Sequence, residues 1–225
     1  MVSSITLKNL IIGYHSKHQL RAIASPVHAS LQAGELTCLI GANGVGKSTL
    51  LRTLAGFQPA LDGEILIQDK SLSDFSAQEL AREISIVLTS KTDHAQLSAE
   101  EIVGIGRSPY TGFWGTLSTA DKQIVASALQ ETGIQHLAQR NISELSDGER
   151  QKVMIAKALA QQTRIIILDE PTAFLDFPSK IETLQMLRRL ANEQHKSILL
   201  STHDVELALQ LSDRLWLMEK SRFSI

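Results

Sequence analysis

A segment at residues 41–49 contains residue types that bind phosphate, at the spacing of a phosphate-binding loop. It fits the pattern G-x-x-x-x-G-K-[ST]. Glycines let the backbone curl without Cβ clashes, so several N–H groups can point at one anion. Lys47 adds a mobile positive charge for the β- and γ-phosphates, and the Ser48 hydroxyl is a hard oxygen ligand that suits Mg²⁺. The segment therefore predicts a nucleotide site formed by Gly41, Asn43, Gly44, Val45, Gly46, Lys47, Ser48 and Thr49.

The flanks of this segment have the structure that such a loop requires. Residues 36–40 are a short apolar run, which predicts a buried strand. Leu50, Leu51 and Leu54 follow at helical spacing, so a helix should begin near Lys47 and turn the positive end of its dipole toward the phosphates. The alternative is a glycine-rich turn that carries Lys-Ser by chance, and it leaves the agreement of both flanks unexplained.

Two adjacent acids end a second apolar strand, predicted over residues 165–168. A carboxylate at the carboxyl end of a buried strand beside a phosphate loop can hold Mg²⁺, directly or through water, and we expect Asp169 to do so. Glu170 would lie where the attacking water sits and act as general base or water-orienting group, an effect of roughly 10²–10⁴-fold. An apolar strand followed by two acids is common in proteins. The phosphate loop upstream makes a magnesium and catalytic role for these two acids much more specific.

A second anion site is predicted at the start of another helix, far from the loop in sequence. Ser146 and Gly148 place a small polar residue and a glycine at the helix N-terminus, where backbone N–H groups are free to bind an anion. Two phosphate-type sites in one chain suit a head-to-tail pair, in which each copy closes over the nucleotide of the other.

The order of these motifs resembles the ATP-binding subunit of an ABC transporter, over nearly the whole chain. After the phosphate loop come Leu-Ser-Asp-Gly-Glu at 145–149, Leu-Asp-Glu-Pro-Thr at 168–172, Leu-Asp at 175–176 and Ser-Thr-His-Asp at 201–204. The resemblance implies that ATP and Mg²⁺ bind here and that Lys47, Glu170 and His203 serve hydrolysis. It also implies roles for four other residues: Tyr14 on adenine, Ser146 and Gly148 at the γ-phosphate of the opposite copy, and Asp176 at the dimer seam.

Two positions depart from the family pattern. Thr89 stands where the family usually has a glutamine that contacts Mg²⁺ and senses the membrane partner, and a threonine supplies an oxygen with a shorter reach. Asp147 stands in the Leu-Ser-Asp-Gly-Glu segment at 145–149, which corresponds to the ABC signature of the family, at a position where that signature usually has glycine. Because an acid near a triphosphate is unfavourable, we expect Asp147 to point away as a helix-start residue.

A narrower resemblance lies in residues 106–110. The segment Gly-Arg-Ser-Pro-Tyr is similar to one in importers of ferric siderophores, haem and cobalamin. A turn that closes a helix with Pro109 would explain the same residues. An importer of another substrate class therefore stays open.

Composition narrows the class of protein. The chain has 225 residues, of which 43% are hydrophobic, and a net charge of -2, so it lacks the basic field of a nucleic-acid-binding protein. Its one cysteine, Cys38, falls in a predicted buried strand and excludes an internal disulfide. No apolar run approaches the roughly 20 residues that span a bilayer, and the first residues lack a signal pattern. We expect a protein at the cytoplasmic face of the inner membrane, attached through a partner.

The fold class expected is α/β, with a nucleotide-binding core, an antiparallel β subdomain and an inserted helical subdomain. Within a single ABC ATP-binding domain of residues 1–225, core and β subdomain take 1–88 and 164–225, and helices take 89–163. Strands are predicted at 5–12, 27–32, 36–40, 64–67, 84–88, 165–168, 197–200 and 215–218. Helices are predicted from 47 and at 76–82, 97–105, 119–132, 149–160 and 180–193. Residues 221–225 are interpreted as a truncated or altered end.

The function expected is an ATPase that energises a membrane importer. Its expected partners are a second copy of itself, transmembrane permease subunits and, indirectly, a substrate-binding protein, with no nucleic acid. A soluble ATPase of the same superfamily is the alternative, although such proteins usually carry two ATPase halves or long inserts. Thr89 and Asp147 also leave open a nucleotide switch that does not hydrolyse ATP. A GTPase is disfavoured because the chain has no Asn-Lys-x-Asp element.

Overall fold

A computed structural model describes residues 3–16, 19–23, 26–88, 96–112, 114–220 and 222–225. The strands are β1 (Ser3–Ile11), β2 (Gly13–Ser16), β3 (Gln19–Ala22), β4 (Val27–Gln32), β5 (Leu36–Ile40), β6 (Asp62–Ile67), β7 (Lys70–Ser71), β8 (Ile84–Val87), β9 (Ile165–Leu168), β10 (Ser197–Thr202), β11 (Arg214–Glu219) and β12 (Arg222–Ser224). The α-helices are α1 (Lys47–Leu54), α2 (Ala77–Glu83), α3 (Ala99–Ile105), α4 (Thr119–Glu131), α5 (Asp147–Ala160), α6 (Phe177–Gln194) and α7 (Val205–Leu211). In the described part of the chain, none of the helices has the length and apolarity needed to cross a membrane.

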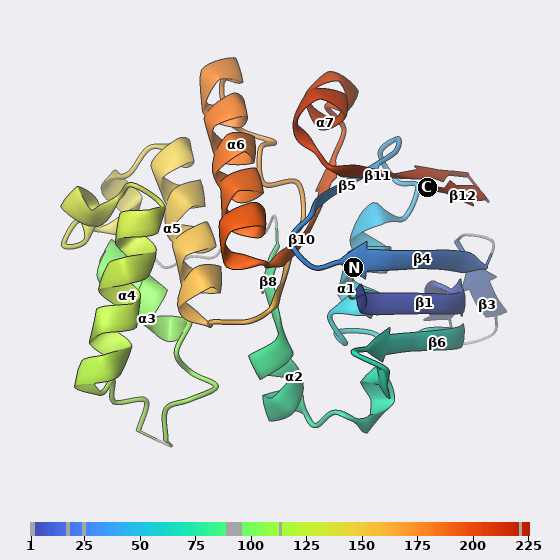
Figure 1. Ribbon diagram of the computed structural model, residues 1–225, viewed down its shortest axis with the longest axis horizontal. Coiled ribbons are helices and arrows are strands. Elements are labelled where there is room, and N and C mark those ends of the chain that lie inside the picture. Colours follow the sequence, from blue (N-terminus) through green and yellow to red (C-terminus); the bar gives the residue numbers. More distant parts are fainter. Residues whose placement is uncertain (1–2, 17–18, 24–25, 89–95, 113, 221) are drawn as a thin grey trace.

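A six-stranded sheet in the order β12-β11-β5-β10-β9-β8 runs through the middle of the molecule (Figure 1). Its strands from β11 to β8 are parallel, and only β12 is antiparallel to its neighbour. Parallel strands end at one edge, so the segments that follow β5, β9 and β10 meet there. These segments carry the phosphate loop, the paired acids and His203.

The strands β5, β9 and β10 are buried along their whole length, which explains their continuous apolar runs. Alternate residues of these strands face opposite sides of the sheet. One set, which includes Cys38, Ile166 and Leu200, packs into the core beneath helices α3 to α6. The other set, which includes Leu39 and Ile167, packs against α1 and the antiparallel sheet. Burial raises the pKa of the Cys38 thiol to about 12, so it packs as a neutral core residue.

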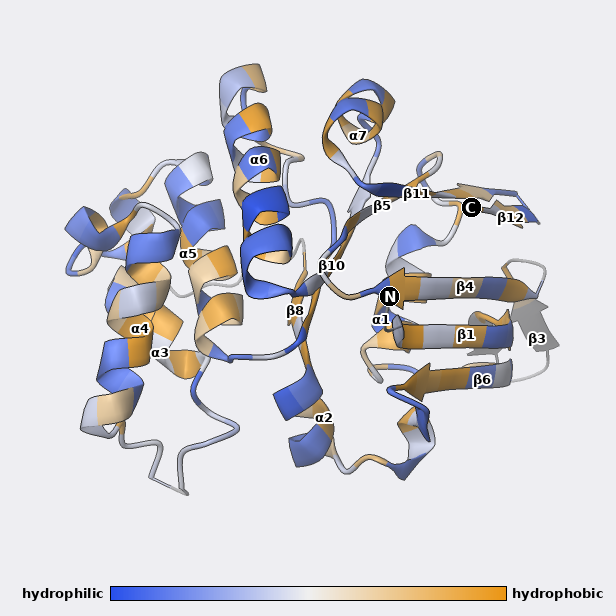
Figure 2. Cartoon of the chain, viewed as in Figure 1, coloured by the Kyte–Doolittle hydropathy of each residue, from blue (hydrophilic) through white to orange (hydrophobic). Residues whose placement is uncertain are grey.

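A second, antiparallel sheet covers one face of the central sheet, in the order β4-β1-β6-β7. Figure 2 shows its strands with alternating hydropathy along their length, as expected for a sheet with one buried face. The β1 strand changes register between Leu7 and Leu10, and Asn9 there has a positive φ of 49°. This irregularity explains why Leu7 and Leu10, three residues apart, both face the core in the strand predicted at 5–12.

The helical part consists mainly of α3, α4 and α5, which pack together at the side away from the antiparallel sheet (Figure 1). Each of these helices begins with a serine whose side chain accepts a hydrogen bond from the N3 backbone N–H. The N3 acid in turn accepts one from the serine N–H. The three serines are Ser98, Ser118 and Ser146. These capping boxes decide where the helices begin.

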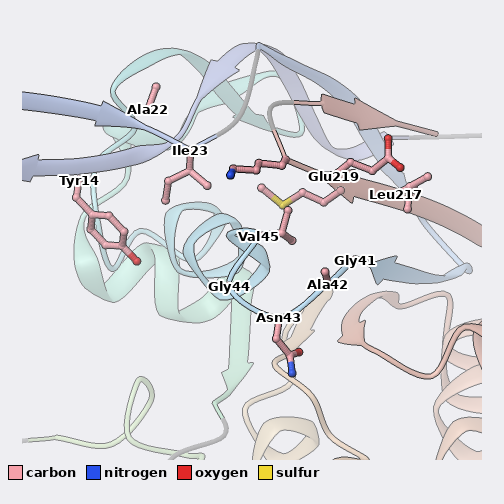
Figure 3. A pocket seen from close by; sticks show the side chains of 12 residues that line it. Tyr14, Ala22, Ile23, Gly41, Ala42, Asn43, Gly44, Val45, Leu217 and Glu219 are labelled. Atoms are coloured by element: carbon pink, nitrogen blue, oxygen red, sulfur yellow. The ribbon is translucent and has the colours of Figure 1, made fainter.

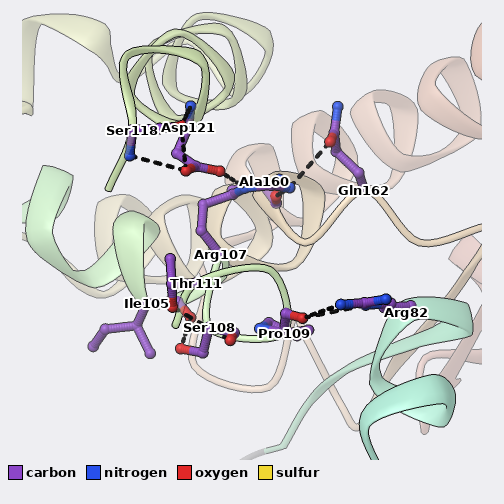
Figure 4. A network of polar contacts seen from close by, with 10 residues as sticks. All are labelled: Arg82, Ile105, Arg107, Ser108, Pro109, Thr111, Ser118, Asp121, Ala160 and Gln162. Carbon is purple, nitrogen blue, oxygen red and sulfur yellow. Dashed lines mark hydrogen bonds and ion pairs between the residues drawn. The ribbon is translucent and has the colours of Figure 1, made fainter. Parts of the chain in front are cut away.

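Arg107 joins the three helices at the centre of this part (Figure 4). Its guanidinium donates from Nε to Asp121 Oδ1 at 2.8 Å and from Nη1 to the Ala160 carbonyl at 2.8 Å. The Tyr110 ring lies 4.1 Å from the guanidinium carbon. A Cβ on Gly106 would come within 2.3 Å of the Lys157 carbonyl oxygen, so only glycine lets α3 pack this closely on α5. Residues 106–110 thus close α3 and also bind its neighbours.

The structure confirms the predicted α/β fold class. Residues 96–112 and 114–163 contain no strand, as expected for a helical block. The sequence patterns do not predict β2, β3, β7, α7 and β12, and the strand predicted at 215–218 is followed by another. Residues 222–224 instead form β12, which pairs with β11, and Phe223 packs edge-on against the Trp216 ring, with 5.6 Å between centroids.

The buried ion pair between Arg107 and Asp121 gives a testable pH dependence. Hydrogen bonds from Ser118 and from Arg107 lower the pKa of Asp121 from 3.8 to about 2. Because the folded-state pKa is depressed, the stabilisation is present above about pH 4 and is lost as the pH falls toward 2. We expect Asp121→Asn to lower the thermal midpoint at pH 7, and the gap from wild type to narrow below about pH 4.

The measurement is the thermal midpoint by circular dichroism between pH 7 and pH 3. Glu193→Gln, at an exposed position of α6, serves as the control and should stay close to wild type throughout. A gap for Asp121→Asn that is constant with pH would contradict this account of the ion pair.

Candidate nucleotide site

The loop between β5 and α1 is shaped by glycines at two kinds of position. Gly44 and Gly46 have φ values of 75° and 115°, in the left-handed region that other residues rarely adopt. At Gly41 the restriction is space, because an added Cβ would lie 2.3 Å from the Met218 carbonyl oxygen. The glycine spacing thus permits the loop to fold against β11 and to curl into the start of α1.

Lys47 places a buried positive charge inside the loop. The residue is 5% exposed, and its Nζ donates to the Gly41 carbonyl at 2.8 Å and to the Ala42 carbonyl at 3.3 Å. The same nitrogen lies 3.7 Å from Glu170 Oε1. The lysine therefore connects the loop to the acids after β9.

Asp169 lies directly beside the loop. Its Oδ1 accepts hydrogen bonds from the Ser48 hydroxyl at 3.1 Å and from the Ser201 hydroxyl at 2.7 Å. The structure thus brings Lys47, Ser48 and Asp169 together, as the sequence analysis required for a shared magnesium nucleotide. Ser201 belongs to the Ser-Thr-His-Asp motif, from which no role for it is predicted. Its position two residues before His203 is the sequence signal that could have pointed to it.

The Ser48 hydroxyl and the Asp169 carboxylate are hard oxygen donors, within hydrogen-bond distance of each other. Mg²⁺ is held in proteins by one or two such groups, with phosphate oxygens and water completing its shell. The donor set therefore fits Mg²⁺. Thr89, the third predicted metal-binding residue, lies outside the described residues.

Glu170 has a strained backbone, with a φ of 47°. A non-glycine residue in the left-handed region costs about 1–3 kcal/mol and persists where surrounding contacts hold it. Its carboxylate lies between two side chains: Oε1 is 3.7 Å from Lys47 Nζ, and Oε2 is 3.8 Å from His203 Nδ1. The strain therefore occurs at the residue predicted to orient water.

Two adjoining cavities, of about 850 and 480 Å³, lie over the loop. The smaller cavity is lined by residues of the phosphate loop and by Asp169 and Glu170. The larger cavity extends toward the end of β11 (Figure 3). Tyr14 borders both and is 50% exposed. The Tyr14 and Thr49 hydroxyls hydrogen bond at 2.7 Å. Ile23 and Met218 also line the larger cavity, and neither was singled out from the sequence.

Comparison with known proteins identifies the family. The family model for ABC transporters matches residues 24–173. The chain belongs to the ABC transporter family. It is 36% identical to the iron(3+)-hydroxamate import ATP-binding protein FhuC of Bacillus subtilis, over 97% of this chain and 80% of that protein. It is 36% identical to the achromobactin transport ATP-binding protein CbrD of Dickeya dadantii, over 95% of this chain and 78% of that protein.

A solved structure agrees with this assignment and with the fold. The dimeric structure of a bacterial ABC transporter cassette has a TM-score of 0.82 and 26% identity, covering 98% of this chain and 97% of that chain. The same cassette has been solved in a dimeric post-hydrolysis state bound to ADP and phosphate. The chain is therefore an ABC-type ATPase.

The ABC signature lies at the start of α5, apart from the loop of the same chain. The Ser146 side chain accepts from the Glu149 N–H and thereby caps α5. A Cβ on Gly148 would lie 3.8 Å from Leu175 Cδ2, just before α6. Neither Ser146 nor Gly148 lines the two cavities over the phosphate loop.

Two acids near the signature act as helix-start residues. Asp147 is exposed in the first turn of α5, and its Oδ1 lies 3.7 Å from Arg150 Nη1 in the following turn. Asp176 caps α6 by accepting from the Ser179 N–H at 3.1 Å, and hydrogen bonds from Ser179 lower its pKa.

Removal of the loop cation gives a direct test of the site. We expect Lys47→Ala to weaken nucleotide binding by about 10–100-fold, because a charge-assisted hydrogen bond contributes about 1.5–3 kcal/mol. The measurement is a fluorescence titration with a labelled ATP analogue, with folding checked by circular dichroism. Lys8→Ala, which removes an exposed lysine of β1, should bind normally. A folded Lys47→Ala protein with wild-type affinity would count against the loop as the site.

Proposed function

We propose that this ABC ATPase energises a membrane importer of metal chelates, of the ferric siderophore, haem or cobalamin class. The observation that supports hydrolysis best is the Glu170 carboxylate between Lys47 and His203, beside Asp169 and Ser48. The cargo class is supported by relatives named for iron(3+)-hydroxamate import and achromobactin transport. An importer of another substrate class, or an ABC ATPase without a transport role, is the alternative.

In this proposal the residues of the loop hold the triphosphate of ATP. Backbone N–H groups and the Lys47 ammonium bind its oxygens, and Ser48 and Asp169 hold Mg²⁺. Bound Mg²⁺ supplies neutralisation of the charge that develops on the γ-phosphate. Thr89 remains a candidate for a further oxygen ligand, and Tyr14 at the rim of both cavities is the candidate for stacking on adenine.

Glu170 orients the attacking water and accepts its proton, and His203 contacts the γ-phosphate. Glu170 Oε2 lies 3.8 Å from His203 Nδ1, so the two side chains adjoin, with Glu170 lining the smaller cavity and His203 lining a neighbouring one. The chemistry is therefore mainly placement of charge, since phosphoryl transfer needs little covalent participation from the protein.

Ser146 and Gly148 complete the site only in a second copy of the chain. The proposal is a head-to-tail homodimer in which the N-terminus of α5 of one copy meets the γ-phosphate bound by the other, with Asp176 near the seam. It is supported by the signature's absence from the cavities over its own loop, and by the dimeric form of a similar cassette.

Different parts of the chain have different roles in this proposal. Residues 1–88 and 164–225 bind and hydrolyse ATP, while the helical residues 89–163 carry the signature and meet transmembrane permease subunits. A substrate-binding protein delivers cargo to those permeases. This arrangement holds the ATPase at the cytoplasmic face of the membrane as a peripheral subunit.

Loss of the water-orienting carboxylate should separate binding from hydrolysis. We expect Glu170→Gln to bind ATP within a few-fold of wild type and to hydrolyse it about 10²-fold more slowly or worse. It should accumulate as an ATP-dependent dimer in size-exclusion chromatography. Glu193→Gln is the matched control on an exposed face of α6 and should turn over normally. Near-normal turnover by Glu170→Gln would overturn the role of this residue.

The transport role is tested by uptake. A strain that lacks the gene should lose accumulation of one radiolabelled compound among ferric hydroxamate, haem and cobalamin. The wild-type or Glu193→Gln gene should restore it, and the Glu170→Gln gene should not. Unchanged uptake of all three compounds would contradict the cargo class, and recovery of the protein with ribosomes instead of membranes would favour the soluble alternative.

A further inference from the structure

The Ser201 hydroxyl contacts both acids of the site, Asp169 and Glu170. Ser201 is the last residue but one of β10, has no exposed surface and lies next to β5 on one side. Its hydroxyl donates to Asp169 Oδ1 at 2.7 Å and accepts from the Glu170 backbone N–H at 2.9 Å. One buried atom thus bonds the carboxylate of one acid and the backbone of the next.

The need for this contact arises where β9 ends. The parallel pairing of β9 with β10 stops at Leu168 and Leu200, so Asp169 and Glu170 leave the sheet one step later. A backbone N–H that leaves a ladder in a buried region requires another acceptor. The Ser201 hydroxyl, at the next position of the neighbouring strand, is the acceptor for the Glu170 N–H.

The contact acts on a residue that is held in an unfavourable conformation. Glu170 has a φ of 47°, and such a conformation persists only where its surroundings hold it. The bond to the Glu170 N–H is one of these constraints, and it holds the backbone of the same residue whose carboxylate faces Lys47 and His203. A change at Ser201 therefore alters the direction in which the Glu170 side chain leaves the backbone.

We propose that Ser201 is a positioning residue that fixes the water-orienting Glu170 relative to the Mg²⁺-holding Asp169. The inference rests on the proposed roles of these two acids in hydrolysis. Ser201 itself touches neither substrate nor metal, and it acts through the two groups that do. Because one hydroxyl serves both, the placement of the water and of the metal ligand is coupled.

The chain supplies a matched control on the same strand. Ser197 is four residues before Ser201, so its side chain is on the same face of β10. It is also fully buried, and its hydroxyl donates to the Ser4 hydroxyl at 2.6 Å. Ser197→Ala therefore removes a buried serine hydroxyl of the same strand, at the end of β10 far from the acids.

The experiment compares Ser201→Ala with Ser197→Ala in the purified full chain. Basal ATPase kinetics give kcat and KM, and a labelled ATP analogue gives nucleotide affinity as Mg²⁺ is varied. We expect Ser201→Ala to lower kcat about tenfold or more, with KM within about threefold, because orientation of a general base contributes to turnover. The Mg²⁺ concentration for half-maximal nucleotide binding should rise several-fold, while Ser197→Ala stays within twofold of wild type in both.

Several outcomes would overturn the inference. One is a kcat and Mg²⁺ dependence for Ser201→Ala within twofold of wild type. Another is an equal loss of kcat in both alanine variants with equally lowered thermal midpoints, since that would mean a structural role only. If Ser201→Ala does not fold, Ser201→Cys keeps the side-chain shape with a somewhat larger sulfur that is only a weak hydrogen-bonding group, and it should show the same losses; normal kinetics in that variant would refute the proposal.

These outcomes differ from a failure of the proposed function. If wild-type protein hydrolyses no ATP, the hydrolytic role of Glu170 fails, while the Mg²⁺ dependence of nucleotide binding still decides the contact of Ser201 with Asp169. If wild type hydrolyses ATP and Glu170→Gln is unimpaired, the site assignment fails whatever Ser201→Ala does.

Discussion

The carboxyl edge of the central parallel sheet holds a buried ammonium near one carboxylate, with a second carboxylate bonded to the same loop, and the other site residues lie around this arrangement. The Lys47 ammonium donates to a carbonyl of its own loop and lies near Glu170. Ser48, the next residue of the same helix, donates a hydrogen bond to Asp169. Each of these groups would be costly to bury alone. Together they connect the segments after β5 and β9, so the loop is preformed around its own cation.

Much of this arrangement was predictable because the responsible signals are local. The glycine spacing, the apolar strands and the serine before α5 each act over a few residues, so the phosphate loop and the paired acids could be predicted, and the start of α5 to within two residues. The helix at 149–160 was predicted two residues short, because Asp147 and Gly148 are weak helix formers that follow a strong cap.

The missed features depend on partners far apart in the chain. Ser201 contacts Asp169, more than thirty residues earlier, only because β10 lies beside β9 in the folded chain. Ile23 and Met218 line a cavity that forms only when distant segments come together. The short strands β7 and β12 are stabilised by their neighbours, and α7 spans only seven residues with little apolar periodicity. Similarly, residues 106–110 gave a family signal, but their structural basis is a buried Arg107 that no periodicity in the sequence would place.

The balance of charge at the edge of the sheet also explains why the nucleotide and the metal belong together. Lys47 lies 3.7 Å from Glu170 Oε1, and the Asp169 carboxylate lies at the Ser48 hydroxyl, so one ammonium and two carboxylates gather at this edge. A free triphosphate would add negative charge beside these two carboxylates, whereas in the proposed function a triphosphate that arrives with Mg²⁺ would bring a cation for Ser48 and Asp169 to hold. The Lys47 ammonium can then turn from the Gly41 and Ala42 carbonyls toward phosphate oxygens without leaving the loop. In the proposed function, the arrangement would therefore favour the magnesium complex of the nucleotide over the free anion before a second copy closes on it.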